Sequence, residues 1–323
     1  RDRGIAIAEF APGAQVIAHK KVFTSAGLYV VSKMDKPDRQ WYAKCPSCEQ
    51  IRTKRIQSDL IGSCPVCQRS IKQQDIQPFV EPDAFSVRID GKHGSSARYR
   101  RSTLIRQRQT LTHFIDHVDE SIFQESKSRL FRLALKEDGT LFRYNLGPEN
   151  KGFVLCTECG FSEPFRSYKA GKKHHPLRSL ARRISCADNL SSKPLAYGHQ
   201  FKSFCMIIRP VVVPASIESL AYSLQRGLCS VLDIEQADIG VSWRRLLNKQ
   251  NQLGFEIILY DHTPGGAGFV KEGMDNWGNV EREAKLICEK CNCESSCYNC
   301  LKSYGNQSHH ELLDRRIVVD FFK

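Results

Sequence analysis

The sequence predicts an α+β fold composed of mixed small domains, and three features lead to this expectation. The 323 residues are 41% hydrophobic, which is enough for two or three modest domains with cores of their own. Short strand-like runs of Val, Ile, Phe and Tyr precede one long stretch with helical periodicity. Many of the fourteen cysteines stand in Cys-x-x-Cys pairs, which in a long chain favour bound metal over a disulfide framework.

Charge and hydropathy exclude several classes of protein. Lys and Arg exceed Asp and Glu by 13, which favours polyanionic partners, and the 26% of charged residues argues against wholesale disorder. No run approaches 18 uninterrupted apolar residues, and the Arg1-Asp2-Arg3 start is not a signal peptide, so no membrane segment is predicted. We therefore expect a cytoplasmic protein whose thiols are reduced.

Residues 1–40 are interpreted as a β-rich connector. Strand-like runs at 15–18, 21–23 and 28–32 are separated by Pro12-Gly13 and by Gly27. Since such hairpins are rarely stable in isolation, we expect the connector to pack on later elements.

Residues 41–80 contain the first cysteine cluster, Cys45-Pro-Ser-Cys48 and, fifteen residues later, Cys64-Pro-Val-Cys67. Two such knuckles can present four thiolates at about 2.3 Å from one zinc ion. A redox Cys-x-x-Cys or buried free thiols are the alternatives, but the second matching pair favours a zinc ribbon.

Residues 81–150 are predicted to be β-rich and basic, and residues 151–190 to form a second zinc module. The module begins with the knuckle Cys156-Thr-Glu-Cys159, and Cys186 is the nearest unpaired cysteine. His174 or His175 can provide the fourth ligand, and we choose His175. The alternative is that both histidines belong to a solvated basic face.

Positive charge is concentrated in two runs, at 98–108 and 166–183, each of which contains a tyrosine. Guanidinium groups beside aromatic rings suit phosphate contact and base stacking, although solubility or pairing with acidic patches of a partner domain would also explain them. The predicted nucleic-acid-binding residues are Arg98, Arg100, Arg101, Lys172, Lys173, Arg178, Arg182 and Arg183.

Residues 191–323 are predicted to form an α/β domain. The expected elements are a strand at 201–213, a helix capped by Ser216 and running to Leu232, strands at 243–247 and 254–260, and a helix at 281–288 that is the last before the final cysteine group. Cys205 and Cys229 lie on the first strand and helix, where buried hydrophobic roles are expected.

Five cysteines follow within thirteen residues, from Cys288 to Cys300. A tetrahedral ion takes four ligands, and we favour a zinc knot of four cysteines that leaves Cys288 on the preceding helix. An iron–sulfur cluster is the alternative, although its thiolate spacing is looser. The four predicted ligands are Cys291, Cys293, Cys297 and Cys300. With about three zinc ions and eleven ligand thiolates, the net charge would fall from +13 to about +8.

No catalytic centre is predicted. The chain has no P-loop, Gly-x-Ser-x-Gly or His-Glu-x-x-His motif. The loop Pro264-Gly-Gly-Ala-Gly268 could cradle a phosphate through its N–H groups. We expect instead that its glycines permit tight packing, with Asp261 and His262 supporting the turn. An enzyme centre at Asp261 and His262 is the weaker alternative.

Four C-terminal motifs carry a family resemblance over about residues 190–323, which weakens over 1–190. They are Leu259-Tyr-Asp-His-Thr-Pro-Gly-Gly-Ala-Gly268, the cysteine knot ending Cys297-Tyr-Asn-Cys300-Leu301, Tyr304-Gly-Asn-Gln307 and Leu313-Asp-Arg315. Together they resemble the MZB family, the zinc-binding C-terminal domain of MrfA-type superfamily 2 DNA helicases, with relatives in the Druantia and DISARM anti-phage systems.

The resemblance implies that Cys291, Cys293, Cys297 and Cys300 hold zinc. The gap between Cys293 and Cys297 looks a residue short, which leaves Cys288 as a possible substitute. It also implies an ATP-dependent 3′–5′ DNA helicase in anti-phage defence or DNA repair. The ATP-binding motor domains are not in this sequence, so we expect a C-terminal portion of a larger assembly.

Two functions are therefore open. In the first, the chain handles single-stranded or forked DNA beside helicase motor domains, in cis or in a partner subunit. In the alternative, it is a non-catalytic protein-interaction scaffold or helper subunit that docks a helicase or nuclease.

Overall fold

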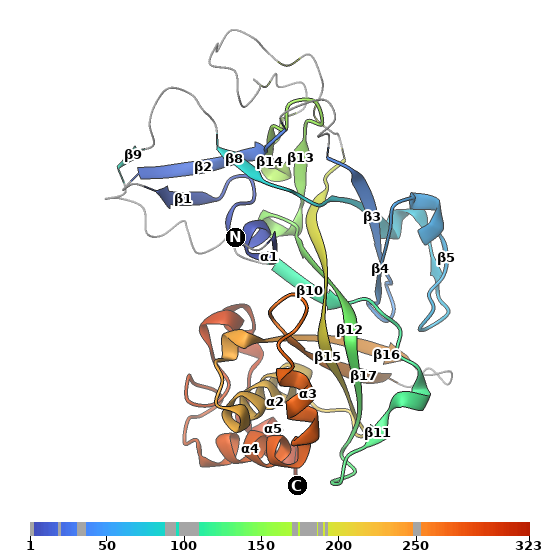
Figure 1. Ribbon diagram of the computed structural model, residues 1–323, viewed down its shortest axis with the longest axis vertical. Helices are drawn as coiled ribbons and strands as arrows, with labels where there is room; N and C mark the ends of the chain where they lie inside the picture. Colours follow the sequence, from blue (N-terminus) through green and yellow to red (C-terminus); the bar gives the residue numbers. More distant parts are fainter. Residues whose placement is uncertain are drawn as a thin grey trace.

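The computed structural model describes residues 3–18, 21–30, 37–87, 95–96, 110–169, 174, 186, 190, 193–247 and 253–323. The fold is α+β, as the sequence predicts. Its spine is a long antiparallel pair, β12 (Phe131–Asn145) and β15 (Ala196–Pro210), which runs from the lower to the upper half in Figure 1. A bulge interrupts the pairing between Lys136 and Gly139.

One nine-stranded sheet is built on this spine, in the order β10-β12-β15-β7-β3-β4, with β11 on β12 and β17 joining β15 to β16. The pairing of β7 with β15 is parallel. The remaining strands are β3 (Arg39–Lys44), β4 (Ile51–Lys54), β7 (Ile76–Val80), β10 (Thr110–Phe114), β11 (Gln124–Glu125), β16 (Ile239–Leu247) and β17 (Leu253–Asp261). Strands from three of the five predicted domains are therefore hydrogen-bonded into one sheet. The boundaries of these domains remain a prediction.

In the lower half the sheet rolls up, because β16 returns to β10. Ser242 Oγ donates a hydrogen bond to the carbonyl oxygen of Thr112 at 2.8 Å. Side chains alternate along the strands: Cys205 and Ile207 point into the roll, whereas Met206 and Ile208 face the helices.

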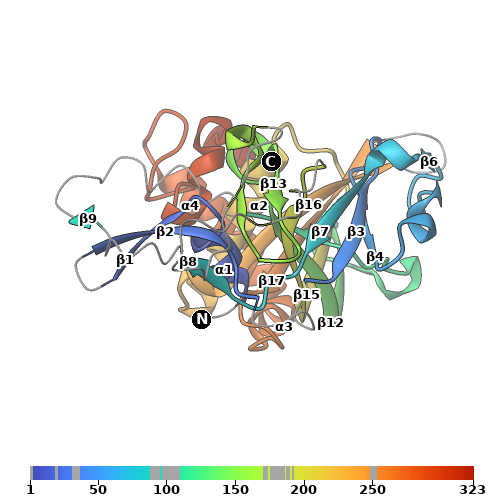
Figure 2. The ribbon, with the colours of Figure 1, turned by 90° about the horizontal axis from the view of Figure 1, so that it is seen from above.

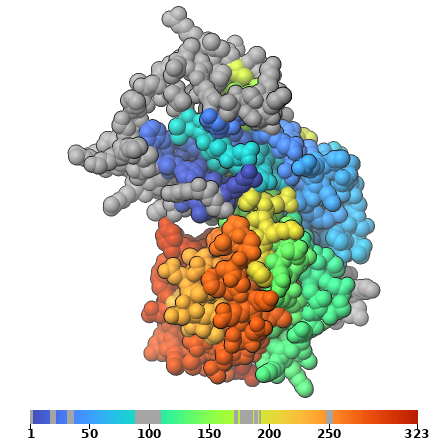
Figure 3. All heavy atoms as spheres, viewed as in Figure 1, coloured from blue at the N-terminus to red at the C-terminus, as the bar shows by residue number. Residues whose placement is uncertain are grey.

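Helices cover the outer face of the roll (Figures 1 and 2). They are α2 (Ile217–Leu232), α3 (Phe269–Asp275), α4 (Trp277–Lys290) and α5 (Arg315–Phe321). Ser216 caps α2 as predicted, since its hydroxyl accepts a hydrogen bond from the backbone N–H of Ser219 at 3.1 Å. The helix predicted at 281–288, before the cysteine knot, is present as α4 and is longer at both ends; the 3-10 segment Tyr304–Leu312 and α5 follow the knot. In the lower half of Figure 3, the orange and red C-terminal residues lie against the green residues of the middle of the chain.

The upper half contains α1 (Arg3–Glu9) and short strands. These are β1 (Gln15–Ala18), β2 (Lys21–Leu28), β8 (Phe85–Val87), β9 (Ser95–Ser96), β13 (Phe153–Leu155) and β14 (Ser162–Pro164). The connector packs on later elements, as expected: the backbone N–H of Leu28 donates to the carbonyl oxygen of Gly160 at 2.8 Å. Gly27 permits this approach, since a Cβ there would lie 2.0 Å from that oxygen.

Short elements complete the described chain. They are the hairpin of β5 (Gly62–Ser63) and β6 (Ser70–Ile71), and the 3-10 helices Gln57–Leu60, Gln73–Asp75, Glu120–Ile122, Pro148–Asn150, Phe165–Ser167 and Gln236–Asp238. Among the described helices, none combines the length and the apolar character needed to cross a membrane.

Candidate metal centres

Three groups of side chains bring four metal-ligating atoms together, with all four within 4.8 Å of one another in each group. The groups are Cys45, Cys48, Cys64 and Cys67; Cys156, Cys159, His174 and Cys186; and Cys291, Cys293, Cys297 and Cys300. All fourteen cysteines are free thiols. A tetrahedral zinc ion with sulfur ligands at about 2.3 Å places neighbouring sulfurs about 3.8 Å apart.

In the first group, two identical backbone turns present the thiols. The N–H of Cys45 donates to the carbonyl oxygen of Gln50 at 2.9 Å, and the N–H of Glu49 donates to that of Cys45 at 3.0 Å. Glu49 takes a left-handed φ of 60° to close the turn. The second knuckle repeats this geometry, with Gln68 at a φ of 59°.

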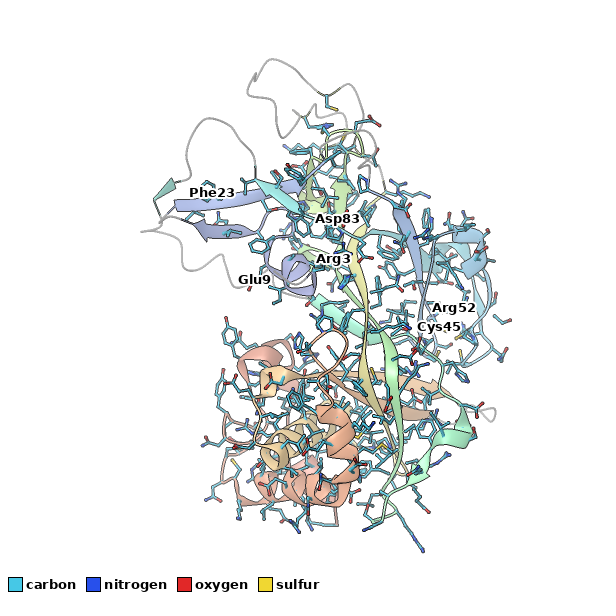
Figure 4. All side chains as sticks on the ribbon, in the orientation of Figure 1. Arg3, Glu9, Phe23, Cys45, Arg52 and Asp83 are labelled. Carbon is cyan, nitrogen blue, oxygen red and sulfur yellow. The ribbon has the colours of Figure 1, made fainter. Side chains whose placement is uncertain are left out.

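The two knuckles face each other. The Sγ atoms of Cys45 and Cys67 lie 3.5 Å apart, as do those of Cys48 and Cys64. These thiols lie against a small apolar core that includes Leu60. Cys45 directly follows β3, so the cluster adjoins the main sheet (Figure 4).

The second group uses the same turn. The N–H of Cys156 donates to the carbonyl oxygen of Phe161 at 2.8 Å, and Gly160 supplies the left-handed residue with a φ of 77°. The Sγ of Cys186 lies 3.8 Å from that of Cys156. A thiol thirty residues along the chain therefore reaches the knuckle at the spacing of a shared tetrahedral ion.

His174 is the fourth member of this group. Its side chain is buried, its ring stacks on Phe161 with centroids 5.1 Å apart, and its carbonyl oxygen accepts the N–H of Cys186 at 2.9 Å. Its Nε2 atom is buried without a hydrogen-bond partner in the described part of the chain. A buried imidazole nitrogen lacking a partner is unfavourable, and a metal ion would satisfy it.

The sequence-based choice is His175, whereas the histidine that lies with these thiols among the described residues is His174. His174 occupies the fourth position, because stacking on Phe161 and the bond to Cys186 direct its ring toward the thiols. His175 itself lies outside the described residues.

The third group is the most compact. Its Sγ distances are 3.5 Å for Cys291–Cys293 and Cys291–Cys297, 3.6 Å for Cys293–Cys300 and 3.9 Å for Cys297–Cys300. Cys288 stays outside the group, fully buried in an apolar core on α4, where burial raises the pKa of its thiol to about 12. The four predicted cysteines therefore lie together, and Cys288 is not a member of the group.

Arg315 supports this knot from the C-terminal motif. Its Nε donates to the carbonyl oxygen of Cys293 at 2.7 Å, and its Nη1 donates to that of Cys288 at 3.2 Å. Its backbone N–H donates to the carbonyl oxygen of Ser295 at 2.7 Å. Arg315 belongs to the Leu313-Asp-Arg315 motif, and its contacts with the knot could not be predicted from the sequence alone.

Each group contains a thiol prepared for ionisation. A hydrogen bond from the Cys48 thiol lowers the pKa of Cys64 to about 4, and one from Cys159 lowers that of Cys156 to about 5. Burial acts to raise the pKa of Cys297, but the N–H of Asn299 and three neighbouring thiols together lower it to about 7. Thiolates are the ligand form of cysteine, and sets of four sulfurs or of three sulfurs and one imidazole fit zinc.

The glycine loop after β17 has a structural role. Asp261 is fully buried, and its carboxylate accepts the N–H groups of Ala267, Gly268 and Val270 at 2.7, 2.5 and 3.0 Å. The N–H of Gly265 donates to the carbonyl oxygen of Lys202. These amides are engaged within the protein and cannot cradle a phosphate, so Asp261 supports the turn, as expected, and fixes the start of α3.

His262 also has a partner in the protein, since its Nε2 lies 3.0 Å from Nη2 of Arg143. With the carboxylate of Asp261 sequestered by three amides, nothing in the described residues favours an enzyme centre here. Cys205 and Cys229 are buried in apolar cores, which agrees with their predicted roles.

The eight predicted nucleic-acid-binding residues all lie outside the described residues: Arg98, Arg100, Arg101, Lys172, Lys173, Arg178, Arg182 and Arg183. Their role in binding remains a prediction.

Comparison with known proteins gives one family match and two curated relatives. Residues 220–301 match the MrfA Zn-binding domain, MZB. The chain is 23% identical over 356 residues to Druantia protein DruE of Escherichia coli (strain UMEA 4076-1), across 98% of this chain and 19% of that protein. It is 36% identical over 45 residues to the uncharacterized ATP-dependent helicase YprA of Bacillus subtilis (strain 168), across 14% of this chain and 6% of that protein. The chain therefore spans less than a fifth of each relative.

Among solved structures, the chain is similar to DUF1998 helicase MrfA bound to DNA. The identity is 14% and the TM-score 0.37, across 67% of this chain and 25% of that one. A likeness this low carries no argument about fold or function.

Proposed function

We propose, on the premise that residues 220–301 belong to the MrfA Zn-binding domain family, that this chain is the zinc-binding, DNA-handling region of an ATP-dependent superfamily 2 DNA helicase. In this proposal it holds three zinc ions and works in the cytoplasm beside motor domains that lie elsewhere in the assembly. Anti-phage defence is the favoured setting, with DNA repair as the second.

The observation that carries the proposal is the family match together with the alignment to DruE over 98% of this chain. The match covers the third cysteine group and the strands and helices around it, while the alignment includes the residues of the two earlier groups. YprA is named as an ATP-dependent helicase, which supports placing ATP hydrolysis in a neighbouring motor.

The zinc ions would act by stiffening short segments. The first and second clusters lie beside small strands that bury few apolar residues of their own, so four metal–ligand bonds in each would replace a larger core. Rigid modules with an excess of positive charge suit the guidance of a DNA strand through phosphate contacts.

One observation favours the alternative, a protein-interaction scaffold. Val211, Val212 and Val213 follow β15 in sequence and are 57%, 63% and 48% exposed. Consecutive exposed valines are typical of a surface that another protein covers. Such a surface is compatible with docking onto a helicase or nuclease.

A charge-reversal variant distinguishes the two functions. Replacing Arg178, Arg182 and Arg183 with Glu should weaken binding of single-stranded and forked DNA at least tenfold, measured by fluorescence anisotropy, because phosphate contacts are lost. Zinc content and assembly with the motor subunit should be unchanged. In the unaltered chain, affinity should fall steeply between about 50 and 200 mM salt. If the affinity for DNA does not change over this salt range, or is unaffected by the substitutions, phosphate contact by residues 166–183 is contradicted. If the substitutions abolish assembly with the motor subunit but leave DNA binding intact, the protein-interaction scaffold is supported.

A further inference from the structure

A surface hollow of about 440 Å³ lies on the predicted zinc ribbon, on the face of the sheet that carries Trp41. Several segments close together in space line it: β3, β7, the 3-10 helices Gln57–Leu60 and Gln73–Asp75, and the chain just before β15. Figure 2 shows β7, β3 and β4 side by side in this part of the molecule. Its lining residues are Trp41, Gln57, Lys72, Gln73, Gln74, Ile76, Pro78 and Lys193.

The indole of Trp41 forms the aromatic part of this lining. In the sheet register Trp41 stands between Lys54 on β4 and Pro78 on β7, so the three residues make one row across the strands. The ring is partly buried against the core of the ribbon. Tyrosine and tryptophan rings that are half-buried in this way combine an apolar face with a polar edge, which suits contact with a planar ligand.

The rim of the hollow is polar and carries positive charge. The lining contains three glutamines, with amide donors and acceptors, and the two lysines Lys72 and Lys193, and none of the described lining residues is acidic. Asp75 is the nearest carboxylate along the chain, and it accepts the backbone N–H of Lys72 at 2.8 Å, which ties it to its own turn. The charge of the rim therefore suits an anionic ligand.

We propose that this hollow binds one unpaired nucleotide of single-stranded DNA, with its base against Trp41, its base edge near the glutamines and its phosphate near Lys72 and Lys193. The proposal rests on the DNA-handling function above and adds a site to it. Base stacking on an aromatic ring tolerates any sequence, and lysines at the rim contact phosphates without reading the base. Cys45 lies four residues after Trp41, so the first metal cluster would hold the strand that carries the ring.

The test compares Trp41→Ala, Trp41→Phe and, as a matched control, Trp243→Phe in the full chain. Each is titrated with labelled oligothymidylate and with an abasic oligodeoxynucleotide of equal length, which keeps the phosphates but lacks the bases. We expect Trp41→Ala to weaken oligothymidylate binding about tenfold and to leave abasic binding unchanged. Trp41→Phe should retain most of the affinity, and oligothymidylate should quench tryptophan fluorescence in Trp243→Phe but not in Trp41→Phe.

Zinc content and circular dichroism establish that each variant is folded. If Trp41→Ala does not fold, the quenching comparison between Trp41→Phe and Trp243→Phe decides the question. If the unaltered chain binds the two oligonucleotides equally well, and neither oligonucleotide quenches the tryptophan fluorescence of Trp243→Phe, the nucleotide site is overturned. Phosphate-based DNA handling would then remain intact. Absence of binding to either oligonucleotide would overturn both proposals.

Discussion

At the scale of single residues, the clusters show which side chains can be grouped from a sequence. Cys45, Cys48, Cys64 and Cys67 could be grouped from their spacing because each knuckle is one local turn, closed by a left-handed residue after its second cysteine. The choice between His174 and His175 could not be made this way. Neighbouring residues direct their side chains differently, and the stacking of His174 on Phe161, thirteen residues earlier, is a tertiary contact.

Substitution of His174 tests the second centre. His174→Ala should reduce bound zinc from about three equivalents to about two, because three remaining thiols leave one position open. His174→Cys should restore most of the zinc by providing a fourth thiolate. Metal content is measured by atomic absorption on purified chain, with His175→Ala as the matched control. Loss of zinc in the control but not in His174→Ala would show that the histidine assignment is wrong.

At the scale of elements, strands and helices were predicted where apolar periodicity is uninterrupted. The apolar residues on the two sides of the bulge after Lys136 belong to one strand, β12, because the bulge breaks the alternation without ending the pairing with β15. A Cβ at Gly139 would lie 2.6 Å from Sγ of Cys205, so the bulge fits a contact with the neighbouring strand. Helix α4 begins at Trp277, four residues before the predicted start.

The loop between β17 and α3 gives a prediction at this scale. Asp261→Ala should lower the free energy of unfolding by about 3 kcal/mol or more, because three N–H groups lose a charged acceptor in a buried site. Asp261→Asn should lower it less, since one oxygen acceptor remains. Urea unfolding followed by circular dichroism measures both, with Asp138→Ala, at an exposed carboxylate, as the control. Equal stability of Asp261→Ala and the unaltered chain would show that the carboxylate does not hold the loop.

At the scale of the whole molecule, the sequence predicted the fold class and the cysteine groups but not how the parts join. Strands of the predicted ribbon, of the basic β-rich segment and of the C-terminal domain share one sheet through β7, β12 and β15. The parallel pairing of β7 with β15 could not be predicted from local sequence, because it links residues more than a hundred positions apart. Long-range pairing of this kind has no periodic signal in a single sequence.

Removal of metal should therefore affect the molecule unevenly. The rolled sheet and α2 bury a large apolar core, which includes Leu220, Met206 and Ile257. None of the predicted metal ligands belongs to this core, so this region should stay folded when zinc is removed. The first and second clusters lie in small cores built partly from their own ligands, and they should open when zinc is removed. Hydrogen–deuterium exchange after treatment with a strong chelator should show lost protection over residues 41–76 and 153–168, and retained protection in β15, β17 and α2. Zinc added back should restore the lost protection. Loss at the same rate throughout would show instead that the shared sheet transmits the opening from the clusters to the whole chain.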